Sequence, residues 1–190
     1  MLAIPLKKPQ RLLSAVLGLL FTIYLGYVYS LVRGADEHFL LVVSLGAEPV
    51  QRFLARNELL RQISASESNG VEALSISLSL SSEDYIDAER AIELARKLLD
   101  IGVDVNGRTA MGFTPLHRAI NLVELDSVAF LLENCADPGV PMSLGPNDEG
   151  SRLNALEMAF LMEREYPHMG YSGVIEVLQR SDLGSGCNFQ

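Results

Sequence analysis

The stretch that decides the fold lies at residues 112–120 and reads GFTPLHRAI. Thr114 carries a hydroxyl that can accept a hydrogen bond from a backbone amide at the start of a helix, and Pro115 suits the first helical position because it has no amide hydrogen. These two residues predict a helix that begins at Thr114. His117 follows within the first turn, and a catalytic role for it would require a nucleophile or an orienting acid nearby.

A repeat with a period of 33 residues surrounds this stretch. Residues 98–106 read LLDIGVDVN and residues 131–138 read LLENCADP, so Asp104 and Asp137 are 33 positions apart. With Val128 and residues 112–120, this unit resembles the ankyrin repeat, whose pattern is roughly G-x-TPLHxA, V-x-x-LL and GADxN. The resemblance implies that the histidine ring bonds neighbouring backbone and links adjacent repeats. It implies structural roles for five residues in all: Thr114, Pro115, Leu116, His117 and Ala119.

Two weaker copies flank the unit, and neither contains the sequence Thr-Pro-Leu-His. Residues 70–74 lie 42 positions before residues 112–116, and residues 154–159 begin 40 positions after Thr114. The first copy carries an insertion of about nine residues around Ser81 to Asp87. The apolar residues at about 36–63, before both copies, have the spacing of a helix pair but no ankyrin signature, as expected of a terminal cap.

We therefore predict an all-α fold, a short ankyrin-repeat solenoid of about four helix pairs preceded by one transmembrane helix. The pairs fall at about 36–63, 72–100, 114–134 and 154–180, and stacking of neighbouring pairs forms the core. One segment leaves an alternative open, because Ile76, Leu78 and Leu80 alternate with serines as in a strand.

The amino-terminal part of the chain predicts a membrane anchor. Residues 12–32 are 21 residues without a charge, enough for a helix that spans roughly 30 Å of hydrocarbon. Tyrosines gather toward its carboxyl end and basic residues precede it, which favours a cytoplasmic amino terminus. A cleaved secretory signal, ending before Ala35, remains an alternative, although its apolar core would be unusually long.

The resulting domain organisation has four parts. We predict a cytoplasmic amino terminus at 1–11, a transmembrane anchor at 12–33, an ankyrin-repeat domain at 34–183 and a flexible tail at 184–190. The protein is then a single-pass protein of the (inner) membrane, and its carboxyl-terminal domain lies in the periplasm or another extracytoplasmic space.

Charge narrows the class of partner. All 24 acidic residues follow residue 34 but only 11 of the 15 basic residues do, so the domain carries a net charge of −13. Such a surface repels phosphate backbones and attracts basic proteins. We expect a protein partner with a basic surface, and no nucleic acid.

The cysteines, the histidines and Ser172 do not form the pattern of a catalytic or metal-binding site. Cys135 and Cys187 are 52 residues apart and form no CxxC pair, so the sequence leaves open whether they form a disulfide or stay free. The three histidines lack the spacing of a helical zinc pair, and Ser172 lacks the second glycine of a nucleophile elbow. We predict no enzyme, with no catalytic residue, metal site, cofactor or small-molecule substrate.

The resemblance also implies where a partner binds, because ankyrin repeats use hairpin tips and the exposed face of each first helix. Carried over residue by residue, these positions include several apolar side chains, as is common at protein contacts. A long hairpin at 140–149 adds Met142 and Leu144 as anchors and two carboxylates for basic charge. The predicted partner-binding residues are Val71, Ser79, Leu80, Ala110, Met111, Phe113, Asn121, Leu122, Met142, Leu144, Asp148, Glu149, Leu161 and Met162.

The leading functional hypothesis is a membrane-anchored module that binds and inhibits a partner protein. In a bacterial host this is an immunity protein against a secreted antibacterial effector, such as a lipase or another periplasm-acting toxin. The alternatives are a scaffold or assembly helper for a periplasmic enzyme and, from another class, a hydrolase with an unrecognised site.

Overall fold

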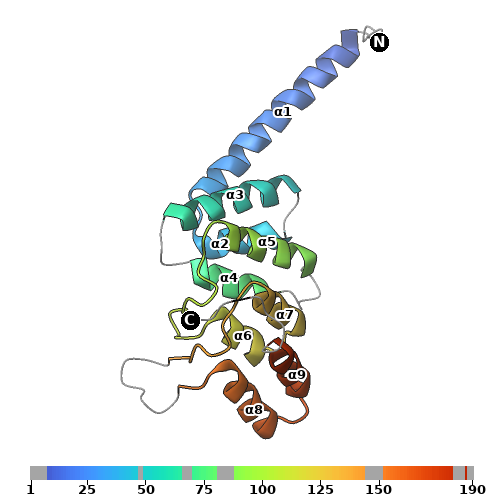
Figure 1. Ribbon diagram of the computed structural model, residues 1–190. Coiled ribbons are helices and arrows are strands. Elements are labelled where there is room, and N and C mark those ends of the chain that lie inside the picture. Colours follow the sequence, from blue (N-terminus) through green and yellow to red (C-terminus); the bar gives the residue numbers. More distant parts are fainter. Residues whose placement is uncertain are drawn as a thin grey trace.

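The computed structural model describes residues 8–46, 49–65, 70–80, 88–143 and 152–181, together with Cys187. Within these residues every regular element is a helix. One long helix projects from one end of a stack of paired helices, and the pairs follow one another to the opposite end (Figure 1). The described structure confirms the predicted all-α solenoid with one apolar amino-terminal helix.

Four helix pairs make up the stack. The first is α2 (Glu37–Gly46) with α3 (Pro49–Ala65), and the second is α4 (Gly70–Ser79) with α5 (Ala88–Asp100). The third is α6 (Pro115–Asn121) with α7 (Leu125–Glu133), and the fourth is α8 (Ala155–Glu165) with α9 (Tyr171–Ser181). Because α4 is helical throughout, the strand alternative for the serine-rich segment is wrong. The predicted insertion around residues 81–87 and the predicted tail, apart from Cys187, lie outside the described residues.

Aliphatic side chains of each pair form one continuous core. Leu59 of the first pair, Leu74 and Leu98 of the second pair and Leu131 of the third pair are fully buried. Polar atoms tie the layers together, since the hydroxyl of Ser127 at the start of α7 donates to the backbone carbonyl of Leu78, which belongs to α4, over 3.1 Å. Each pair is thus stabilised by its neighbours, as in other solenoids.

Helix starts in the third and fourth layers use the same chemistry 40 residues apart. The Thr114 hydroxyl accepts a hydrogen bond from the His117 amide over 3.3 Å, and Pro115 occupies the first turn of α6. Asn154 caps α8 through a capping box with Glu157, in which both bonds measure 2.9 Å. The weaker fourth repeat therefore begins where the sequence places it.

The long helix α1 (Lys8–Arg33) holds the candidate membrane span. Its segment Ser14–Arg33 is 20 residues long with a mean hydropathy of 1.9, which is long and apolar enough to cross a membrane. Only 11% of the span is buried, and its buried side chains are Val28 and Val32, near the stack. A signal sequence near the amino terminus can pass the same test of length and composition, so the helix is a candidate for either a membrane span or a signal sequence.

Candidate protein-binding surface

A tight hairpin turn precedes α6 and carries the most exposed predicted contact residue. The Thr109 amide donates to the carbonyl of Phe113 over 2.8 Å, and the Gly112 amide donates to the carbonyl of Thr109 over 2.9 Å. Gly112 has a φ of 81°, which glycine adopts without steric cost. The tip of this turn is formed by Ala110 and Met111, both exposed, and 67% of the Met111 surface is accessible.

Bonds to the following hairpin hold this turn in place. The Ser143 amide donates to the carbonyl of Gly112 over 3.0 Å. The Arg108 guanidinium donates to the carbonyl of Pro141 over 2.8 Å. These bonds hold the backbone of the tip in place, so the backbone of the turn loses little conformational entropy when it binds a partner.

His117 lies directly beneath this hairpin and links the third repeat to the fourth. Its Nε2 lies 3.2 Å from the carbonyl oxygen of Leu153, and its Nδ1 lies 2.8 Å from the hydroxyl of Thr114. A carbonyl only accepts hydrogen bonds, so Nε2 carries the proton and Nδ1 accepts the threonine hydroxyl. Both ring nitrogens are thus occupied by structural bonds.

The environment keeps this histidine neutral. Burial lowers the pKa of the His117 imidazole below its ordinary value; the bond to Leu153 partly opposes this shift, and the nearby Arg108 charge adds a smaller lowering of the pKa. Only 1% of its surface is accessible. The ring therefore has neither the free nitrogen nor the solvent access that a general base requires.

The structure separates the predicted contact residues into groups. Phe113, at the base of the hairpin, is half-buried, and the exposed Asn121 and Leu122 lie at the far end of α6. The seven residues of α6 place these two about 10 Å from the hairpin. The hairpin tip and Leu122 are therefore at opposite ends of one helix.

One predicted anchor is wrong. Only 8% of the Met142 surface is accessible, because its backbone amide donates to the carbonyl of Leu153 over 2.9 Å and draws the residue against the fourth repeat. Its side chain is therefore not offered to a partner. The remaining predictions for this long hairpin, Leu144, Asp148 and Glu149, lie outside the described residues.

The predicted contacts on the second and fourth repeats are less exposed than those of the third. Leu80 and Met162 pack against the core, and the Ser79 hydroxyl donates to the carbonyl of Ile76 over 2.9 Å. All members of this group are only partly exposed: Val71, Ser79, Leu80, Leu161 and Met162. The third repeat thus offers the best apolar contact side chain.

Sequence reasoning missed a second group of exposed apolar residues, at the short turns that join the helices of a pair. Leu125 begins α7, and Tyr166 and Met169 lie between α8 and α9. Their accessible fractions are 42%, 54% and 61%. The ankyrin pattern directs attention to the hairpins, so it contains no signal for these turns.

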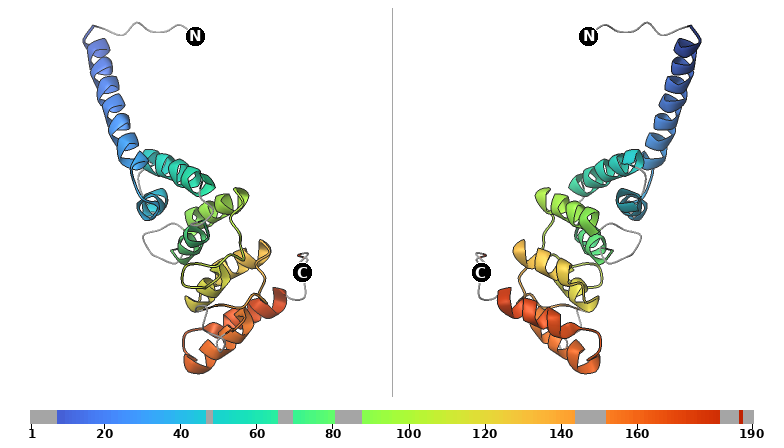
Figure 2. Two further views of the ribbon diagram at one scale, coloured as in Figure 1. Left: turned by 90° about the vertical axis from the view of Figure 1, so that its left-hand side faces the viewer. Right: turned by 90° about the vertical axis from the view of Figure 1, so that its right-hand side faces the viewer.

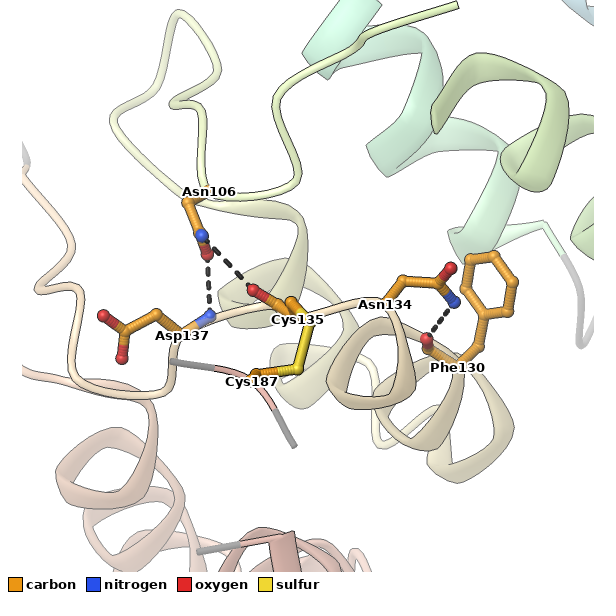
Figure 3. The surroundings of a disulfide bond; sticks show 6 residues. All are labelled: Asn106, Phe130, Asn134, Cys135, Asp137 and Cys187. Carbon is orange, nitrogen blue, oxygen red and sulfur yellow. Dashed lines mark hydrogen bonds between the residues drawn. A yellow bond between two sulfur atoms is a disulfide. The ribbon is translucent and has the colours of Figure 1, made fainter. Parts of the chain in front are cut away.

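A disulfide and an asparagine join the ends of successive repeats (Figure 3). Cys135 is bonded to Cys187, which resolves the question that the sequence left open. Next to it, the Asp137 amide donates to the Asn106 side-chain oxygen over 2.7 Å, and the Asn106 side-chain nitrogen donates to the carbonyl of Cys135 over 3.4 Å. The tail is therefore tied to the same point that joins the second and third repeats.

Comparison with known families agrees with this geometry. The family model described as Ankyrin repeat matches residues 111–142, which comprise the hairpin tip, α6, α7 and the start of the next hairpin. The chain therefore contains an ankyrin repeat, and its helix pairs form a helical-repeat solenoid. No curated protein matches the chain. Ankyrin repeats are protein-interaction modules and are generally not catalytic.

Proposed function

We propose that this protein is a membrane-anchored ankyrin module that binds and inhibits a partner protein outside the cytoplasm. The observation that carries the proposal is Met111, an apolar side chain with 67% of its surface accessible at the tip of a braced hairpin within the ankyrin repeat. Exposed apolar residues on a rigid support are typical of the central contacts in protein interfaces.

The apolar span and the disulfide support an anchored, extracytoplasmic domain, and the net charge bears on its partner. The α1 span is long and apolar enough to cross a membrane, and Lys7, Lys8 and Arg11 precede its uncharged part, which favours a cytoplasmic amino terminus. The Cys135–Cys187 disulfide suits an oxidising compartment such as the periplasm. The net charge of −13 after residue 34 favours a basic partner surface.

The specific form that we propose is an immunity protein. It covers the active site of a secreted antibacterial effector, such as a lipase or another toxin that acts in the periplasm. Attachment to the membrane confines the inhibitor to the surface where such a toxin acts, which raises its effective concentration there. An assembly scaffold for a periplasmic enzyme is the alternative. An inhibitor abolishes the activity of its partner in a reconstituted assay, whereas a scaffold preserves or raises it.

Two exposed methionines provide a matched test of the binding surface. Met111→Asp places a charge on the hairpin tip, and Met169→Asp places the same charge on the turn between α8 and α9, where 61% of the methionine surface is accessible. We expect Met111→Asp to weaken capture of a partner from a periplasmic extract at least about tenfold, which corresponds to about 1.4 kcal/mol. Met169→Asp should capture it normally. Equal capture by both variants would exclude the hairpin as the contact.

A further inference from the structure

The first helix pair is attached to the side of α1 rather than to its end. The Gln51 side chain, in the first turn of α3, donates to the Tyr24 hydroxyl over 3.1 Å, and the Gln62 side chain donates to the carbonyl of Ala35 over 3.3 Å. Between these contacts Val28 and Val32 of α1 are buried. In Figure 2, α3 lies beside the lower end of α1 in both views. The amino-terminal end of α3 is therefore level with Tyr24.

This height on α1 matters if α1 crosses a membrane. Tyr24 is nine residues before Arg33, so the start of α3 lies about 13 Å closer to the amino-terminal end of α1 than the last residue of α1 does. The uncharged segment before α3 begins, residues 12–24, has 13 residues and spans only about 20 Å, whereas a bilayer core is about 30 Å thick. The bilayer must then extend past Tyr24 and reach the first turns of α3.

The exposed side of α3 carries one aromatic side chain close to its amino-terminal end. Pro49, Phe53, Asn57 and Arg61 recur at intervals of four residues and are all exposed, with 56% of the Phe53 surface accessible. Three tyrosine rings in the carboxyl-terminal half of α1 are exposed as well: Tyr24, Tyr27 and Tyr29. Aromatic rings favour the headgroup layer of a bilayer.

Charge is distributed unevenly along the stack. Residues 35–65, which include the first pair, contain three basic and four acidic residues, a net charge of −1, whereas residues 66–190 contain 8 basic and 20 acidic residues, a net charge of −12. Within α3, Arg56 pairs with Glu93 over 2.9 Å and Arg61 pairs with Glu58. An anionic bilayer surface therefore repels the remaining layers more strongly than the layer next to α1.

We propose that α3 docks on the bilayer that α1 crosses, with Phe53 at the boundary between headgroups and acyl chains and the acidic remaining layers directed away from the headgroups. The inference rests on the membrane anchor of the proposed function. The consequence is that the solenoid has a fixed orientation on the membrane and does not swing on a free tether.

The absence of tryptophan from the chain allows a direct test. Phe53→Trp and Phe160→Trp each introduce one reporter at phenylalanines of similar exposure, 56% and 49%, in the first and the last layer. The full chain is reconstituted in vesicles of phosphatidylcholine and phosphatidylglycerol whose acyl chains are brominated. We expect the Phe53→Trp emission to shift to shorter wavelength and to be quenched by bromine, and the Phe160→Trp emission to remain that of an exposed indole.

The outcomes separate this inference from the anchor itself. Extraction of the chain from vesicles by alkaline carbonate would contradict both the anchor and the docking. A chain that resists extraction while Phe53→Trp stays unquenched would overturn the docking alone. Circular dichroism of each variant establishes that it is folded.

Discussion

Cys135 occupies a backbone position that the repeat normally gives to glycine, and this can be tested by substitution. It lies 33 residues after Gly102, and both have left-handed backbones, with φ values of 65° for Cys135 and 93° for Gly102. A residue with a side chain costs roughly 1–2 kcal/mol in this conformation. Cys135 is therefore locally unfavourable and is compensated by its disulfide to Cys187.

The two contributions differ enough in size to be separated. The disulfide closes a loop with a sequence separation of 52, for which loss of chain entropy in the unfolded state gives about 4 kcal/mol of stability. Cys187→Ser loses this contribution and keeps the strained cysteine. Cys135→Gly also loses this contribution. It regains about 1 kcal/mol, because glycine adopts the left-handed backbone without steric cost, and this gain exceeds the entropy that glycine adds to the unfolded chain.

Urea unfolding of the full chain in detergent micelles, followed by circular dichroism, measures these differences. We expect the free energy of unfolding to fall in the order wild type, Cys135→Gly, Cys187→Ser. In the presence of reductant the wild type should drop to the level of Cys187→Ser, and Cys135→Gly should then be the most stable of the three. If the two variants are equally stable with and without reductant, the left-handed cysteine carries no cost and the reasoning fails.

Two further predictions concern the helix starts of the third and fourth repeats. The pKa of His117 is lowered by burial, so the unfolded chain binds a proton that the native ring does not, and the free energy of unfolding should fall as the pH drops below about 6.5. His117→Gln keeps an amide near Leu153 without a titratable group, so it should flatten this dependence in urea titrations at several pH values, and an unchanged slope would assign the dependence to another group. Asn154→Ala removes the capping box of α8 and should cost about 1 kcal/mol in thermal or urea unfolding. Asn57→Ala, at an exposed position of α3, is its control and should cost much less.

Local sequence was sufficient to predict the helices of the stack. The predicted pair at 114–134 corresponds to Pro115–Asn121 and Leu125–Glu133, and the predicted pair at 154–180 corresponds to Ala155–Glu165 and Tyr171–Ser181. Caps, prolines and the spacing of apolar residues act within one or two turns, so these boundaries can be read from the residues themselves. The register of the repeat identified residue 154 as the equivalent of Thr114, and the structure shows that both residues cap a helix.

Burial of individual contact residues was harder to predict because it depends on distant partners. Met142 belongs to an irregular segment, and it is buried because its amide meets the carbonyl of Leu153 across the next hairpin. Nothing within the sequence of this hairpin specifies that register. Likewise, Leu125 and Met169 are exposed because of how the turns at the ends of pairs are arranged, and the pattern of one repeat does not contain that information.

The contact between α1 and α3 shows why the apolar helix and the solenoid have to be considered together. Hydropathy alone separates residues 12–32, as a candidate membrane span, from everything after residue 34. The bonds from Gln51 to Tyr24 and from Gln62 to Ala35 instead place the first turns of α3 beside the apolar helix. If α1 crosses a membrane as proposed, a boundary drawn at residue 34 leaves α3 partly within the layer that α1 occupies. On that proposal the α1–α3 contact sets the orientation in which the Met111 hairpin meets a partner, and substitutions in α3 should change access to that hairpin without altering its structure.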